Sequence, residues 1–248
     1  MKHYFNFIII FLIIGFSLTA NGQIFDNLSQ SQGYFNYVPN PGFEQTIREY
    51  CRWNQSGRKY MEDIYHWDSP TETTPDLFST RVKPDCWANP KKHSDGKQKP
   101  RSGDNMAGIK TYGKGGTDTF WHEYLMVELD SILIPGEKYY AEFYTARAVR
   151  ADMASNNLGM YFSDNAIVTR DRMPLFLTPQ INADEIIQSR WNMWKKVSGV
   201  FTVSSEKKFL IIGNFYHDEV TDVNKFPEGQ GGAYYYIDDV LVRRAKPG

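Results

Sequence analysis

Two adjacent aspartates interrupt an apolar run near the end of the chain, AYYYIDDVLV at 233–242. The aromatic and β-branched residues around them predict a strand, in which neighbouring side chains point to opposite faces. Asp238 would then share its face with Val240 and Val242, which indicate a core-facing row, while Asp239 would point to the other side. A carboxylate beside a core needs compensation, because burying it alone is costly. The alternatives are a bound cation, backbone N–H donors, or an ion pair with a lysine, Arg48 or Arg101.

Motifs of catalysis are missing from the sequence, which has no GxSxG, HExxH, P-loop or GxGxxG segment. His122 and Glu123 are neighbours in FWHEY, but on a strand they would face opposite ways and would not easily hold one ion together. The segment YHDEVTD at 216–222 suits either a metal-binding loop or a solvated acidic loop. A glycosidase needs two carboxylates across a sugar bond, and no spacing among the 29 acidic residues singles out a pair. We therefore predict no catalytic residue and a protein that is not an enzyme.

Aromatic residues make up 15% of the chain, with 16 tyrosines and 6 tryptophans, and flat rings can stack on the C–H faces of sugars. The segments 154–162 and 213–219 have the character of loop–strand junctions that could meet at one rim. Core packing is the competing explanation for each aromatic residue, and packing around a disulfide for the tryptophans within 52–104. The candidate ligand-binding residues are Trp67, Trp87, Trp121, Tyr144, Tyr161, Asn214 and Tyr216.

The first residues have the layout of a secretory signal peptide, with Lys2 and His3 ahead of an apolar run at 7–16 and small or polar residues after it. That run is shorter than the roughly 20 residues of a membrane span, so we predict a signal peptide at 1–22 and not a membrane anchor. Removing Lys2 with the signal leaves 27 of the 28 basic residues against 29 acidic ones. No basic stripe is present, which argues against nucleic acid as a partner.

The two cysteines, Cys51 and Cys86, are expected to pair in an exported chain, because the chain meets oxidising conditions. The bridge would close a loop of about 35 residues. Two unpaired buried thiols are the alternative reading. A metal site made of cysteine alone is not expected, because no CxxC spacing occurs.

Alternating apolar residues and turn signals predict a succession of strands with long loops and almost no helix. We expect one all-β domain over 24–248, a single β-sandwich. Residues 52–104 are expected to form an irregular excursion, and a short helix is expected near 183–189. The predicted strands are 105–113, 120–129, 138–149, 158–163, 194–203, 208–216 and 233–242.

Five motifs occur in order along the chain: VPNPGFE, PRSGDNMAGI, WKKVSGVF, FLIIGNF and YYYIDDVLV. Together they resemble the jelly-roll carbohydrate-binding modules of the CenC-like group, within the galactose-binding-like superfamily. The closest resemblance is to secreted envelope domains of Bacteroidetes that often precede an OmpA-like domain. The resemblance covers roughly residues 36–243, and each motif alone is weakly specific.

In many modules of this group an acidic residue of the closing DD and the Glu of GFE bind one structural Ca²⁺. Carried onto this sequence, the resemblance implies Asp238 or Asp239, Glu44 and the carbonyl of Gly42 as ligands. Oxygen ligands of this kind suit a hard cation. The ion would then stabilise the fold and take no part in chemistry.

Three functional hypotheses follow. The first is an exported, non-catalytic module that binds a poly- or oligosaccharide at the bacterial cell envelope. The second is a structural or interaction component of the envelope that contacts other envelope proteins during secretion, motility or surface assembly. The third is a polysaccharide hydrolase or lyase. The expected location is the periplasm, the outer-membrane surface or the extracellular space.

Overall fold

The computed structural model describes residues 35–48, 51–52, 62–94, 97–113, 121–189, 192–227, 229 and 231–246. The chain divides into two compact units, Met1–Phe35 and Asn36–Gly248, and all the strands below belong to the second. The signal peptide predicted at 1–22 lies outside the described residues. In the part of the chain that the structure describes, no helix combines the length and apolar character that crossing a membrane requires.

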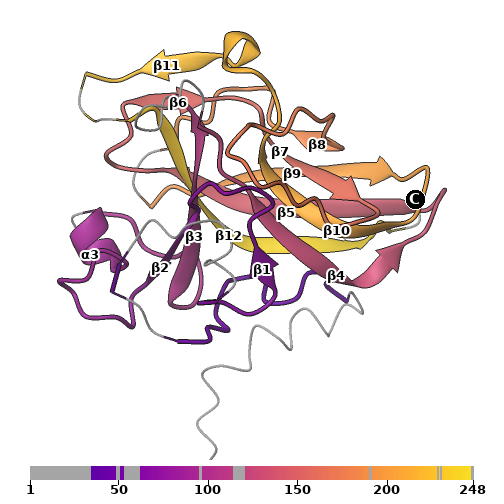
Figure 1. The fold of residues 1–248 in the computed structure, drawn as a ribbon, viewed down its shortest axis with the longest axis horizontal. Coiled ribbons are helices and arrows are strands. Elements are labelled where there is room, and N and C mark those ends of the chain that lie inside the picture. Colours follow the sequence, from indigo (N-terminus) through magenta and orange to yellow (C-terminus); the bar gives the residue numbers. More distant parts are fainter. Residues whose placement is uncertain are drawn as a thin grey trace, which may run out of the picture. The chain divides into compact units, whose positions relative to one another are not determined.

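Two sheets of mainly antiparallel strands make the second unit a β-sandwich, as the sequence predicts (Figure 1). The five-stranded sheet has the order β1 (Trp67–Asp68), β4 (Leu125–Leu133), β10 (Lys207–Asn214), β7 (Leu158–Ser163) and β8 (Ile181–Asn182). The seven-stranded sheet contains β2 (Asp76–Ser79), β3 (Asn105–Tyr112), β12 (Ala233–Arg244), β5 (Lys138–Arg147) and β9 (Lys195–Thr202), each paired with the next. It is extended beside the start of β12 by β6 (Met153–Ser155) and β11 (Val223–Lys225). Among the described residues, the short helices are α3 (Pro90–His93) and the 3₁₀ turn η1 (Asp218–Val220).

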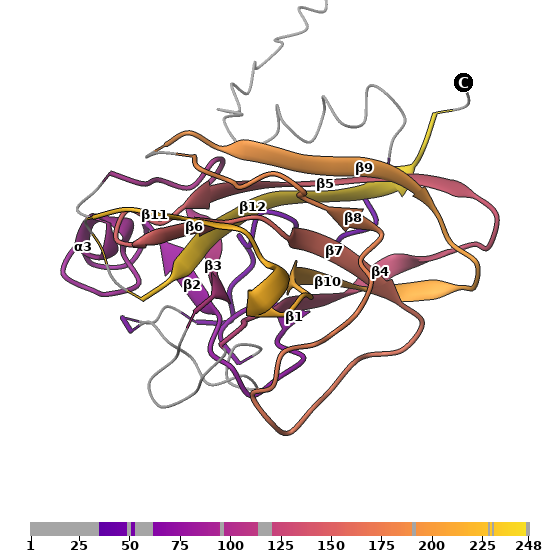
Figure 2. The ribbon, with the colours of Figure 1, turned by 90° about the horizontal axis from the view of Figure 1, so that it is seen from above.

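The main apolar core lies between the two sheets, which Figure 2 shows as two layers. Alternate residues of each strand point inward, because successive side chains of a strand face opposite sides of the sheet. Leu210 and Ile212 of β10 enter this core from the five-stranded sheet, and Phe143 and Tyr235 enter it from the other. The start of the second unit is fixed along β12: the Asn36 side chain donates to the Val240 carbonyl at 2.9 Å and accepts from the Val242 amide at 3.0 Å.

Strand β12 carries a bulge at its two aspartates. Its register with β5 shifts after Asp238, and Asp239 has a φ of 49°. One extra residue reverses the faces of all the side chains that follow it. Val240 and Val242 therefore enter the sandwich core beside Ile237. The prediction that these valines share the face of Asp238 is wrong, although Asp238 is itself buried.

The seven predicted strands correspond to β3, β4, β5, β7, β9, β10 and β12. The helix predicted near 183–189 is not formed, since these residues have irregular backbone. The excursion predicted at 52–104 is less irregular than expected, because it contributes β1, β2 and α3. The predicted disulfide between Cys51 and Cys86 is confirmed, and the Trp87 amide beside it donates to the Cys51 carbonyl at 3.0 Å.

Candidate functional site

Residues 101–105 (RSGDN) hold the carboxylates near the end of the chain. Asp238 is fully buried, and one of its oxygens accepts from the backbone N–H groups of Arg101 at 2.7 Å and Ser102 at 3.3 Å. Its other oxygen accepts from the Asp239 N–H at 2.8 Å. Burial, followed by repulsion from Asp239, raises the pKa of Asp238 to about 8. The backbone donors oppose this rise but do not cancel it.

Arg101 also reaches the second aspartate through its side chain. Its guanidinium pairs with Asp239, whose other oxygen accepts from the Ser102 hydroxyl at 2.6 Å. The same guanidinium stacks on Tyr144, with Cζ 3.5 Å from the ring centroid. Tyr144 lies opposite Asp238 in the register of β5 with β12. Arg101 therefore joins the aspartates to the outer face of the seven-stranded sheet.

Glu44 is held by the other end of the same segment. One oxygen of Glu44 accepts from the N–H groups of Asp104 at 2.9 Å and Asn105 at 2.8 Å. Its other oxygen lies 3.6 Å from the Arg81 guanidinium. Gly103 has a φ of 57°, and a Cβ there would lie 2.3 Å from the Glu44 carboxylate. This position therefore requires glycine, both for its backbone conformation and for the close approach of Glu44.

The carboxylate cluster is Glu44, Asp238 and Asp239, gathered beside Gly42. A Cβ on Gly42 would lie 3.6 Å from Asp238 Oδ1 and 3.7 Å from Asp239 Oδ1. The buried side chain of Asn105 donates to the Phe43 carbonyl at 2.7 Å, and its Oδ1 has no hydrogen-bond partner among the described residues. Carboxylate, amide and carbonyl oxygens are the ligands that Ca²⁺ takes, so this donor set fits a calcium ion. In the described ranges no group of three His, Cys, Asp or Glu side chains stands ready to hold a metal, so amide, carbonyl or water oxygens would have to complete the shell.

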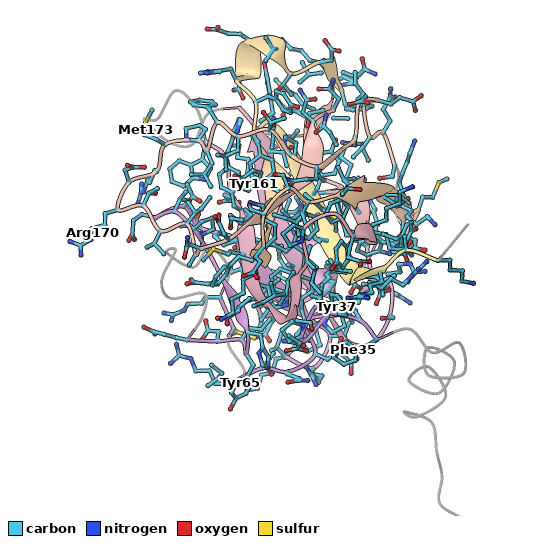
Figure 3. All side chains as sticks on the ribbon, turned by 90° about the vertical axis from the view of Figure 1, so that its right-hand side faces the viewer. Phe35, Tyr37, Tyr65, Tyr161, Arg170 and Met173 are labelled. Carbon is cyan, nitrogen blue, oxygen red and sulfur yellow. A yellow bond between two sulfur atoms is a disulfide. The ribbon has the colours of Figure 1, made fainter. Side chains whose placement is uncertain are left out.

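The outer face of the five-stranded sheet is covered by the chain itself. Residues 164–180, here called the strap, cross it without forming a strand or helix. Leu175 of the strap is buried in an apolar cluster with side chains of β10 and of the segment leading into β4. Its N–H donates to the Tyr124 hydroxyl at 2.9 Å. Figure 2 shows the strap extending beyond the sheets, and Figure 3 labels Arg170 and Met173 on its outer side.

Half of the outer face of the seven-stranded sheet is covered as well. Phe78 of β2 and Tyr236 of β12 pack there against His93 of α3, with ring centroids 4.5 and 5.9 Å from the imidazole. Burial lowers the pKa of His93 to about 4. The covered half of this outer face is therefore the half formed by β2 and β3, on which the excursion 80–104 lies.

The other half of that face is open, and we call it the platform. Val200 at its edge is 61% exposed. Lys196 donates to the Tyr140 hydroxyl at 3.4 Å and pairs with Glu142 at 3.3 Å, and the Arg243 guanidinium lies 4.7 Å from the Tyr140 ring centroid. The platform consists of outward residues of three adjacent strands: Tyr140, Glu142, Tyr144, Lys196, Ser198, Val200, Leu241 and Arg243.

Two of the predicted ligand residues are buried instead. Trp67 lies in the main core, where its indole N–H donates to the Asn40 carbonyl at 2.9 Å. Asn214 is also buried, and its amide donates to the Thr111 carbonyl at 2.9 Å. A ligand on the surface would reach neither side chain in this structure.

The remaining predicted ligand residues lie in separate places. Trp121 donates to Glu123 at 2.9 Å, and Trp87, 40% exposed beside the disulfide, lies 5.2 Å from the ammonium of Lys92. Tyr161 is half-buried in the cluster under the strap, and half-buried Tyr216 has its N–H bound by Asn214. Tyr144 is the one predicted ligand residue on the platform.

Sequence reasoning missed Tyr140, Arg101 and Arg243 as members of the surface around Tyr144. The signal for Tyr140 was present, because Tyr140, Glu142 and Tyr144 alternate in KYYAEFYTAR and must share a face. The approach of Arg101 had no such signal, since this residue comes from a loop.

Glu123 and Asp218, two acidic residues outside the carboxylate cluster, are bonded within the fold. Glu123 accepts from the Lys110 N–H, the Trp121 indole and the Thr74 hydroxyl at 2.8 to 2.9 Å, and burial raises its pKa. In the acidic segment 216–222, Asp218 contacts buried His122 at 2.7 Å. Such bonding supports the fold, and it singles out no pair of carboxylates for catalysis.

No family model matches the sequence, and no curated protein matches it. Among solved structures, the xylan-binding CBM22-1 domain of Paenibacillus barcinonensis Xyn10C is 12% identical with a TM-score of 0.40, over 78% of this chain and 92% of that one. TmCBM61, solved with β-1,4-galactotriose, is 16% identical with a TM-score of 0.37, over 85% and 99%. The cleaved adhesin domain of Lys-gingipain from Porphyromonas gingivalis is 11% identical with a TM-score of 0.36, over 69% and 84%. Likeness at this level assigns this chain neither a family nor a ligand.

Proposed function

We propose that this protein is an exported, non-catalytic module that binds a poly- or oligosaccharide on the platform, at the cell envelope or outside the cell. The observation that carries the proposal is the difference between the two outer faces. The strap fills one face, whereas the platform leaves two tyrosines beside charged and hydroxyl side chains. The order of the sequence motifs supports the same function by resemblance.

The platform has the two kinds of group that sugar binding requires. Tyr140 and Tyr144, with the Arg243 and Arg101 guanidinium groups over their rings, supply flat surface on which a sugar ring can lie. Glu142, Lys196 and Ser198 surround them with acceptors and donors for hydroxyl groups. A site of this kind positions a sugar and contains no arrangement of acid and base to cleave one.

A calcium ion in the carboxylate cluster is part of the same proposal. Asp238, Asp239 and Glu44 would hold it, with the Gly42 carbonyl and the Asn105 amide oxygen as further ligands. The ion would supply positive charge where burial raises the pKa of Asp238. Its role would be to stabilise the contact between chain segments that carry the site.

Binding to a panel of immobilised soluble and insoluble glycans tests the platform. We expect Tyr140→Ala to weaken binding about two- to tenfold, since an aromatic contact is worth about 0.5–1.5 kcal/mol. Tyr144→Ala should weaken binding as well, because it removes the ring that supports Arg101. Tyr65→Ala is the matched control, because Tyr65 is 51% exposed outside the platform. Equal binding by all three variants would place the glycan elsewhere, and no binding by the unaltered protein to any glycan would overturn the proposal.

The strap favours a second candidate, an interaction component of the envelope. Val168 and Met173 of the strap and Val220 of η1 expose 57%, 61% and 63% of their surfaces. Exposed apolar side chains are typical of protein contacts where they form one contiguous patch. Crosslinking from Met173 in intact cells, compared with crosslinking from Val200, would favour this candidate if only the strap captured a specific envelope protein.

A further inference from the structure

The outer side of Tyr144 is occupied by Arg101, and this changes what the platform offers to a ligand. The guanidinium stacks on the ring with Cζ 3.5 Å from its centroid, and it is fixed at its edge by the ion pair with Asp239. Stacking and a carboxylate together orient a planar guanidinium, because its donors form a rigid fork. The surface that a ligand meets above Tyr144 is therefore a positioned arginine.

Arg101 keeps donors for a ligand in this position. One Nη group serves Asp239, and its Nε and other Nη group have no acceptor among the described residues. The side chain is 36% exposed, so part of it reaches solvent. A carboxylate accepts two parallel bonds from such a fork, whereas a hydroxyl accepts one.

Neighbouring charges favour an anion as well. Arg101, Lys196 and Arg243 lie around the two tyrosines, against the two carboxylates of Glu142 and Asp239. Glu142 is paired with Lys196 and Asp239 with Arg101, so these five groups together carry one net positive charge. The third acid nearby, Asp238, is buried beneath the segment 101–105 and faces no ligand.

We infer that the platform takes an acidic glycan and that Arg101 binds the carboxylate of a uronic acid residue. This inference rests on the proposed function and names the ligand class within it. Tyr144 then acts as the support that orients Arg101, and Tyr140, with Arg243 over its ring, lies on the same face for contact with a neighbouring sugar.

The test compares acidic polymers with forms of the same polymers that lack the charge. Polygalacturonate, alginate and glucuronate-bearing xylan are each immobilised beside their carboxyl-reduced forms, and binding is measured at low and at moderate salt. We expect at least one acidic polymer to bind at least tenfold more tightly than its reduced form. Arg101→Gln should remove that preference, and Arg101→Lys should restore only part of it, because lysine lacks the fork.

Arg170→Gln is the matched control, since it removes one exposed arginine from the strap. It should bind as the unaltered protein does. Thermal unfolding of each variant, with near-ultraviolet circular dichroism, confirms that the fold is kept. If the reduced polymers bind as well as the acidic ones, or if Arg101→Gln keeps the preference, the inference is wrong while glycan binding stands. If neither form of any polymer binds, the inference is wrong, and the wider glycan panel decides whether the proposed function stands.

Discussion

At the scale of single residues, Asp238 is a buried carboxylate that accepts its hydrogen bonds from backbone N–H groups. The sequence indicated a buried carboxylate with three possible partners: a cation, an arginine or N–H groups. In the structure the three donors to Asp238 are backbone N–H groups, while Arg101 pairs with its neighbour Asp239. These donors do not offset burial and repulsion, so the pKa of Asp238 stays near 8.

The raised pKa sets a direction for stability against pH. A carboxyl whose pKa rises from 3.8 in the unfolded chain to about 8 in the folded one binds its proton more tightly when folded. Its contribution to stability is complete below about pH 4 and is lost as pH rises toward 8. In EDTA we expect the stability of Asp238→Asn relative to the unaltered protein to rise between pH 5 and pH 8, by about 3–4 kcal/mol.

Urea unfolding of both proteins from pH 5 to 8 measures this difference, and groups common to both cancel. Glu128→Gln serves as the control for loss of one negative charge, because Glu128 is a surface carboxylate of β4 away from the carboxylate cluster. If the difference in free energy of unfolding between Asp238→Asn and the unaltered protein does not change with pH, Asp238 has an ordinary pKa.

At the scale of elements, the strap decides which face of the sandwich is open. It has no regular backbone hydrogen bonding of its own, and Leu175 anchors it in the cluster over the five-stranded sheet. Because few other side chains of the strap are buried, its local stability depends on that anchor.

We expect Leu175→Ala to cost about 2–3 kcal/mol and to loosen the strap before the sheets. Hydrogen exchange followed by peptide mass spectrometry should show faster exchange across 165–177 and little change in β5 or β12. Met173→Ala is the control, since that side chain is 61% exposed. Faster exchange throughout the sheets would mean that the strap and the sandwich open as one unit.

At the scale of the whole molecule, the carboxylate cluster joins three distant parts of the sequence. Glu44 comes from near the start of the second unit, 101–105 from its first half, and Asp238 and Asp239 from its last strand. A cation at this point would therefore stabilise the fold as a whole.

With excess EDTA and then Ca²⁺, we expect the midpoint of thermal unfolding to rise by several degrees with calcium, since a bound ion stabilises only the folded state. The rise should vanish in Asp238→Ala or Glu44→Ala and persist in Glu128→Ala, a surface carboxylate on β4. An unchanged midpoint in the unaltered protein would remove calcium from the proposal and leave the platform unaffected.

The strands were predictable because alternation along 138–149 or 208–216 has one physical meaning, a sheet with a buried side. The bulge in β12 was not, since one inserted residue leaves no mark in the pattern YYYIDDVLV. Val240 and Val242 were therefore assigned to the wrong face. The cluster residues were reached through resemblance. The stacking of Arg101 on Tyr144 could not be predicted from the sequence, because a contact between a loop and a strand depends on the path of the whole excursion.

The hydrogen bonds of Asn36 along β12 have a mechanical consequence. Residue 36 and the C-terminal half of β12 lie side by side, because Asn36 is bound to both Val240 and Val242. A pulling force applied through these two points would peel that short contact apart one bond after another, and the load would then pass to the pairing of β12 with β5. Under tension the segment at residue 36 would thus separate first, before the platform strands β5 and β12 part.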